Sequence, residues 1–183
     1  MRTRLTLPLA AVALAVLTGC SGQQPPPQSA AAVPGPTGEQ PSEQDKTWMR
    51  AIHQANLTEV QAGRLAQGKA TTKPIKQVGE MLVKDHTELD TQVTRTAEQL
   101  GIDLPTSPST EQHELLDRIG EVSGQDFDQD FLSGMIKAHR EALNATKTEI
   151  SKGSAPAVVA LAKTAAPSLE HHLKALRKAQ SGG

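Results

Sequence analysis

Residues 73–101 read KPIKQVGEMLVKDHTELDTQVTRTAEQLG, and this stretch decides the fold. Apolar positions recur at steps of three, four and seven residues, so they share one face of a helix with 3.6 residues per turn. Pro74 is tolerated in a first helical turn, and Gly101 is typical of the residue that ends a helix. The stretch therefore predicts one long amphipathic helix, whose inner face carries Ile75, Val78, Leu82, Leu89, Val93, Thr96 and Leu100.

Three further segments of similar length repeat this pattern. The first is expected to begin after Ser42, whose hydroxyl can cap a helix. The second begins near Asp126 and ends at Gly153, and the third opens at Ser154 and Pro156. Because each helix has one apolar face to bury, the sequence predicts an all-α protein with an antiparallel four-helix bundle.

The connection between the second and third long helices covers residues 102–125. It contains a short amphipathic segment around residues 111–119, which Ser109 and Gln112 can start as a capping box. The connection either folds back locally or crosses the length of the bundle, as in ferritin-like folds. No segment alternates apolar and polar residues between turns, so no strand is predicted.

Residues 1–19 have the features of a secretory signal. Arg2 and Arg4 precede an apolar run that is too short to span a bilayer. The run ends in the box Leu17-Thr18-Gly19-Cys20, which resembles the cleavage site of bacterial lipoproteins. The resemblance implies a lipidated Cys20 as the first mature residue, with attachment to a membrane and an extracytoplasmic location. Cleavage nearby in an ordinary secreted protein is the alternative.

The rest of the chain divides into two parts. Residues 20–44 hold the lipidated Cys followed by a Pro-, Gln- and Ser-rich stretch without a periodic apolar face, which predicts a disordered tether. Residues 45–180 form the bundle domain.

Composition excludes several functions. The net charge is −1 and aromatic residues make up 2% of the chain, so neither a basic surface nor stacking platforms for nucleic acid are expected. The single Cys excludes an internal disulfide framework. The sequence contains no phosphate-binding loop and no nucleophile elbow, which disfavours an envelope hydrolase.

Four polar residues interrupt the apolar faces, one on each long helix. Glu59, His86 and His139 fall near the middle of their faces, and His172 lies toward the edge of its face. At 1.5 Å per residue, all four lie near mid-bundle. Three imidazoles and one carboxylate suit zinc, copper or iron. A hydrogen-bonded polar layer that fixes helix register is the other interpretation, as is a set of side chains that reach water.

Two other histidines, His53 and His171, lie well away from the apolar faces of their helices. We expect both side chains to be solvated.

Four stretches together resemble the bacterial family of unknown function numbered 4142: residues 55–60, 81–87, 127–139 and 167–173. The resemblance implies a ferritin-like fold and an extracytoplasmic location, and it carries no established activity. Di-iron bundles use Glu-x-x-His on two helices. Here Val83, Ile136 and Leu169 stand three residues before the histidines, so a carboxylate-rich di-iron site is not supported.

The sequence thus favours a lipid-anchored bundle of the cell envelope with a non-enzymatic role, either in interaction with an envelope protein or in stress protection. The alternative is a metal-binding or redox protein that uses the mid-bundle cluster of Glu59, His86, His139 and His172.

Overall fold

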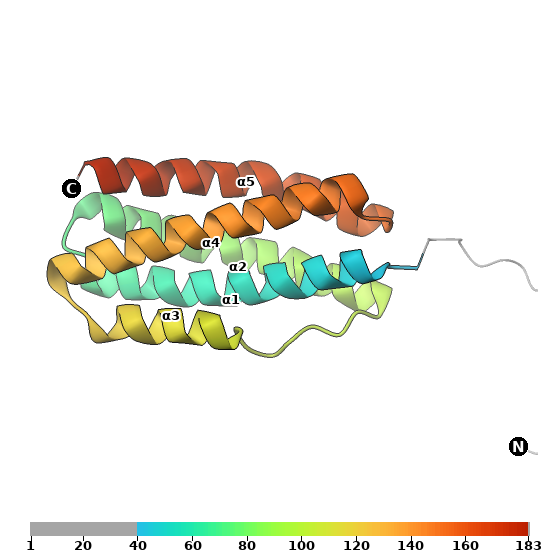
Figure 1. Cartoon of the computed structure of the whole chain (residues 1–183), viewed down its shortest axis with the longest axis horizontal. Coiled ribbons are helices and arrows are strands. Elements are labelled where there is room, and N and C mark those ends of the chain that lie inside the picture. Colours follow the sequence, from blue (N-terminus) through green and yellow to red (C-terminus); the bar gives the residue numbers. More distant parts are fainter. Residues whose placement is uncertain (1–39, 183) are drawn as a thin grey trace, which may run out of the picture. The chain divides into compact units, whose positions relative to one another are not determined.

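The computed structural model describes residues 40–182, which contain helices and no strand (Figure 1). The all-α bundle with a short extra helix is confirmed. Residues 1–39, including the predicted signal peptide and Cys20, lie outside the described part. The helices are α1 (Glu43–Lys69), α2 (Lys73–Leu100), α3 (Thr110–Glu121), α4 (Gly124–Lys152) and α5 (Pro156–Ser181).

Local sequence determines several helix ends as expected. The Ser42 side chain accepts a hydrogen bond from the backbone N–H of Asp45, and the Asp45 carboxylate accepts one from the backbone N–H of Ser42. Ser109 and Gln112 form the predicted capping box of α3. The last helix begins at Pro156, as expected; Ala155 precedes it without a side-chain cap, and Ser154 donates to Asp45.

The connection between α2 and α4 crosses the length of the bundle. At one end, the backbone of Thr71, just after α1, donates to Asp128 near the start of α4. At the other end, Arg50 near the start of α1 donates to the carbonyl of Asp103, just after α2. Therefore α2 and α4 run in the same direction, and each is antiparallel to α1. This is the ferritin-like alternative of the two topologies that the sequence allowed.

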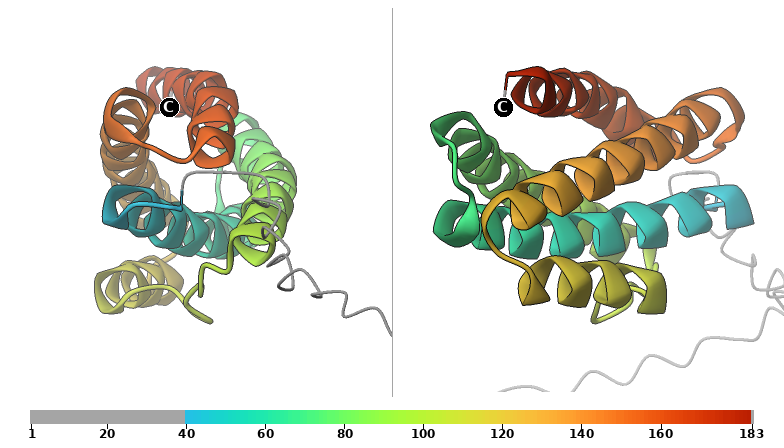
Figure 2. Two further views of the ribbon diagram at one scale, coloured as in Figure 1. Left: turned by 90° about the vertical axis from the view of Figure 1, so that its right-hand side faces the viewer. Right: turned by 60° about the vertical axis from the view of Figure 1, so that its left-hand side comes forward.

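Four long helices enclose the core, and α3 lies outside them. The end-on view shows α1, α2, α5 and α4 around a common centre, with α3 against α1 and α4 (Figure 2). The largest buried side chains include Trp48, Phe127 and Phe131. None of the helices within residues 40–182 is both long and apolar enough to cross a bilayer.

Two glycines, Gly63 and Gly79, face each other where α1 and α2 pack together. A Cβ atom built on Gly63 would lie 2.7 Å from the carbonyl oxygen of Gly79, and one on Gly79 would lie 2.7 Å from the carbonyl oxygen of Gly63. These distances are shorter than side chains tolerate, so the crossing requires glycine on both helices. Glu59 lies one turn before Gly63, and His86 lies two turns after Gly79. The crossing thus sets the spacing between these two side chains.

Candidate metal centre

The structure brings together the four polar residues that the sequence singled out. Each long helix contributes one: Glu59 from α1, His86 from α2, His139 from α4 and His172 from α5. Their exposed fractions are 1%, 1%, 0% and 1%. His172, which the helical wheel placed toward the edge of its face, is as deeply buried as the others.

The distances among these residues suit a single small ion. The three imidazole ring centroids lie 5.0 to 5.5 Å apart. One nitrogen from each ring can be chosen so that all three lie within 4.8 Å of one another. The Glu59 Oε2 atom lies 2.6 Å from His86 Nε2 and 3.2 Å from His139 Nε2. Two donors that are each about 2 Å from one ion lie at most about 4 Å apart, so nitrogens within 4.8 Å of one another need only small side-chain shifts to share an ion.

Each histidine uses its other ring nitrogen in a hydrogen bond to an oxygen outside the cluster. His86 Nδ1 lies 2.9 Å from the Asn56 side-chain oxygen, and His139 Nδ1 lies 3.0 Å from the Met135 carbonyl. His172 Nε2 lies 3.0 Å from an oxygen of the Asp85 carboxylate. A carbonyl or carboxylate oxygen only accepts, so we assign the proton of each ring to its outward nitrogen. The same arrangement orients metal-ligating histidines in proteins generally.

The orientation of the Asn56 amide is fixed by a further partner. Its Nδ2 lies 3.3 Å from an oxygen of Asp90 and donates to that carboxylate. The amide oxygen is therefore the atom that faces His86. Because this oxygen can only accept, Nδ1 of His86 carries a proton and donates it to Asn56.

The inward nitrogens consequently present lone pairs to one another and to Glu59. His86 Nε2, His139 Nε2, His172 Nδ1 and both oxygens of Glu59 are buried without a hydrogen-bond partner. The 2.6 Å approach of Glu59 to His86 lacks the direction of a hydrogen bond. Unsatisfied buried polar atoms are costly, and here they converge from four helices. A four-coordinate cation held among them would satisfy the three nitrogens and one oxygen of Glu59.

The protonation states agree with this arrangement. Burial lowers the pKa of His139, and it lowers the pKa of His172 to about 4, so both rings are neutral near pH 7. Burial raises the pKa of Glu59, but the neighbouring His139 and His86 outweigh burial and lower this pKa to about 2. His139 and His172 therefore offer neutral imidazoles and Glu59 offers a carboxylate anion, the forms in which these groups bind metals.

The expectation that His53 is solvated was wrong. This side chain is 9% exposed, with Nδ1 2.7 Å from Asp90 and Nε2 3.0 Å from the Pro105 carbonyl. The loop between α2 and α3 covers the face of α1 that the helical wheel directed to water. His171 is exposed, as expected.

Sequence reasoning also missed the residues that orient the histidines. Asn56 and Asp85 were not recognised as functional, although Asp85 directly precedes His86. The sequence did contain a signal for such a partner. His172 lies at the edge of its apolar face, so its buried ring needed a polar residue on a neighbouring helix. The partner, Asp85, has a side chain that is 30% exposed and lies at that boundary.

Comparison with known proteins identifies relatives of the fold. Residues 29–179 match the family described as a domain of unknown function, DUF4142. No curated protein sequence matches the chain.

Two solved structures are similar. A DUF305 fragment from Deinococcus radiodurans superimposes with a TM-score of 0.66 and 13% identity, over 75% of this chain and 95% of that chain. CopM in its Cu(I)-bound form superimposes with a TM-score of 0.62 and 16% identity, over 73% of this chain and 93% of that chain. At these identities the likeness shows the fold alone.

Proposed function

The chain belongs to the DUF4142 family of unknown function, and from that premise we propose that it is a lipid-anchored, extracytoplasmic protein that binds one transition-metal ion. The ligands are Glu59, His86, His139 and His172. One observation carries the proposal: three imidazoles donate outward and leave their inward nitrogens without a partner beside a buried carboxylate.

The donor set favours zinc. Three neutral imidazole nitrogens and one carboxylate oxygen complete the tetrahedral coordination that Zn²⁺ adopts in proteins. The similar structure of CopM was solved with Cu(I) bound, which makes copper the second ion to test. Cu(I) prefers thiolate and thioether ligands, whereas the four donors here are nitrogen and oxygen.

The arrangement supports holding an ion rather than catalysis. Catalytic zinc sites keep a coordination position open for water or substrate, whereas structural sites are closed by four protein ligands. Here four side chains from four helices are each at most 1% exposed. We therefore propose a non-enzymatic role in stress protection, in which the bundle withdraws metal ions from other envelope molecules.

The anchor rests on the sequence around Cys20. A Cys20→Ala variant should fail to be lipidated and should leave the membrane fraction, because the anchoring lipid is attached to the sulfur of this residue. Fractionation of cells that express each form measures this. If the variant is processed and still sediments with membranes, another surface holds the protein there.

Metal binding is tested on the purified full chain. After chelation and reloading, elemental analysis should find one zinc ion per chain, and chelation should lower the melting temperature because the ion binds only the folded state. His86→Ala and His139→Ala should each lose the ion.

The matched control is His171→Ala, which removes an exposed histidine next to His172 and should keep the ion. Failure of the wild-type protein to bind zinc or copper, or equal binding by the His86 and His171 variants, would reject the proposal.

A further inference from the structure

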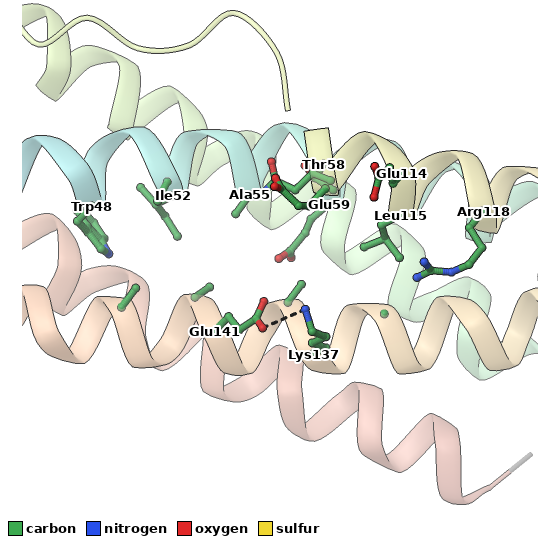
Figure 3. A pocket seen from close by; sticks show the side chains of 17 residues that line it. Trp48, Ile52, Ala55, Thr58, Glu59, Glu114, Leu115, Arg118, Lys137 and Glu141 are labelled. Atoms are coloured by element: carbon green, nitrogen blue, oxygen red, sulfur yellow. Dashed lines mark ion pairs between the residues drawn. The ribbon is translucent and has the colours of Figure 1, made fainter. Parts of the chain in front are cut away.

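A cavity of about 360 Å³ lies between α1, α3 and α4 (Figure 3). Its inner walls are largely apolar, with Trp48 and Ala55 from α1, Leu115 from α3 and Ala142 from α4. Charged side chains also line it: Glu111, Glu114, Arg118, Lys137 and Glu141. Two of them, Lys137 and Glu141, form an ion pair at 3.1 Å.

The cavity reaches the metal centre at one residue. Of the four donors, only Glu59 lines it. Figure 3 shows the Glu59 side chain pointing from α1 toward α4, and its carboxylate is buried. Oε2 faces His86 and His139, and neither carboxylate oxygen has a hydrogen-bond partner. Glu59 thus links the cavity, which it lines, to the histidines that it contacts.

Other approaches to the centre are less direct. Asp85 is partly exposed, but it contacts the outward nitrogen of His172, so the imidazole ring separates Asp85 from the inward donors. A second cavity, between α1 and α2, is lined by Asn56 and Asp90 and by none of the four donors.

We infer that the cavity between α1, α3 and α4 is the passage through which a divalent metal ion reaches the centre, with Glu59 as its first ligand. This inference rests on the proposed metal site. A hydrated ion exchanges water for the Glu59 carboxylate at the inner end of the passage. It then exchanges the remaining waters for the three imidazole nitrogens. The released waters leave through the same space, and no redox step takes place.

Substitutions that narrow the passage without changing any of the four metal ligands test this inference. Ala55 and Ala142 line the cavity and are half-buried, so a leucine at either position extends into open space. In the Ala55→Leu and Ala142→Leu variants, the rate constants of zinc uptake and of zinc release should fall together by about tenfold, which corresponds to about 1.4 kcal/mol of barrier. The dissociation constant should stay unchanged, because the path is altered and its end states are not.

Stopped-flow mixing with Zn²⁺ measures uptake, and transfer to an excess of a colorimetric chelator measures release, both on the full chain. Ala160→Leu is the matched control, since Ala160 is an exposed helical alanine outside the cavity. Its exchange rates should equal those of the wild type. Circular dichroism shows whether each variant is folded, and either cavity variant alone is sufficient for the test.

The possible outcomes separate two failures. If the wild type binds no metal, the proposed function fails. If the wild type binds zinc and a folded cavity variant exchanges it as fast as the wild type, the ion uses another path and the inference is overturned. Faster release without slower uptake also overturns it, because the cavity then only supports the geometry of the site.

Discussion

At the scale of the residue, the tautomer of each histidine matters as much as its position. A ring that donated inward would place a proton where the ion should lie. Asn56, Asp85 and the Met135 carbonyl prevent this by accepting from the outward nitrogens. Residues that orient metal-bound histidines in this way affect affinity although they do not touch the ion.

Removal of an orienting residue should therefore weaken metal binding. Asp85→Ala should lower zinc affinity by about 10- to 100-fold, because His172 loses the acceptor that fixes its ring and proton. Competition titration against a chelator of known affinity measures the change. Asp117→Ala, at an exposed position of α3, is the control and should leave the affinity unaltered. Equal affinities in the two variants would mean that Asp85 does not orient a ligand.

Helical periodicity was sufficient to find the four donors and insufficient to find their partners. A polar residue in the middle of an apolar face must be buried, whatever the neighbouring helix is. The contacts of Asn56 with His86 and of Asp85 with His172 join different helices, so they depend on helix rotation and pairing. His53 shows the same limit, because a loop distant in sequence covers it.

At the scale of the element, the crossing of α1 and α2 holds Glu59 beside His86. Gly79→Ala would place a Cβ atom 2.7 Å from a backbone oxygen of Gly63, which cannot move away without the helix. The variant should lose about 1–3 kcal/mol of unfolding free energy, as in other overpacked interfaces. It should also bind zinc more weakly, because the two ligands separate.

Gly68→Ala is the matched control for this crossing. Nothing lies within 4 Å of a Cβ atom at Gly68, which is exposed within α1. Alanine there should stabilise the protein by about 0.5–1 kcal/mol through its higher helix propensity. Denaturant unfolding of both variants without metal gives the comparison. Stabilisation by both substitutions would show that the helices do not need the glycine contact.

A second link between elements joins the start of α1 to the turn before α5. The Asp45 carboxylate accepts from Ser42 and from the backbone of Ser154, and these hydrogen bonds outweigh burial and hold its pKa well below the usual range. Glu149 lies nearby. Burial raises its pKa to about 7, and Asp45 contributes in the same direction. Glu149 is therefore protonated in the folded protein at mildly acidic pH.

The two groups act on stability in opposite directions. For Asp45, whose folded pKa is lowered, the stabilisation is present above its unfolded pKa and is lost as pH falls. For Glu149, the folded state holds its proton up to about pH 7, while the unfolded state releases it near the ordinary glutamate pKa of 4.5. Since the folded state binds more protons across this window, the Glu149 contribution to stability declines as pH rises from about 4.5 to 7.

Replacement of Glu149 isolates its contribution. Glu149→Gln keeps a neutral side chain at every pH, so its stability relative to the wild type should increase between about pH 4.5 and 7 and then level off. Denaturant unfolding of both proteins across this range measures the difference. A difference that does not vary with pH would mean that Glu149 titrates normally in the folded state.

At the scale of the whole molecule, amphipathic faces predicted the number and burial of the long helices but not their connection. The apolar face of a helix predicts which of its residues are buried, but it does not predict whether the helix runs parallel or antiparallel to its neighbours. The direction of α4 is decided by contacts such as Thr71 with Asp128 and Arg50 with Asp103. These contacts hold the two ends of the connection between α2 and α4 at opposite ends of α1. The periodicity of apolar residues does not predict such contacts. The ferritin-like path of the connection between α2 and α4 was therefore known only from the structure.

The bundle should depend on leucines from more than one helix. Leu82 of α2 and Leu169 of α5 are both fully buried. Replacement of either by alanine should cost about 2–5 kcal/mol, the usual range for a buried leucine. Chemical denaturation followed by circular dichroism measures the loss. Full stability in both variants would contradict the packing described here.

If four helices direct one metal ion to a common point, a crystal structure of the zinc-loaded protein, with anomalous scattering to locate the ion, will show it. We expect one zinc ion bound by His86 Nε2, His139 Nε2, His172 Nδ1 and a Glu59 oxygen, with Zn–N distances of about 2.0–2.1 Å. An ion bound elsewhere, or a zinc-soaked crystal in which these side chains contact only one another, would contradict it.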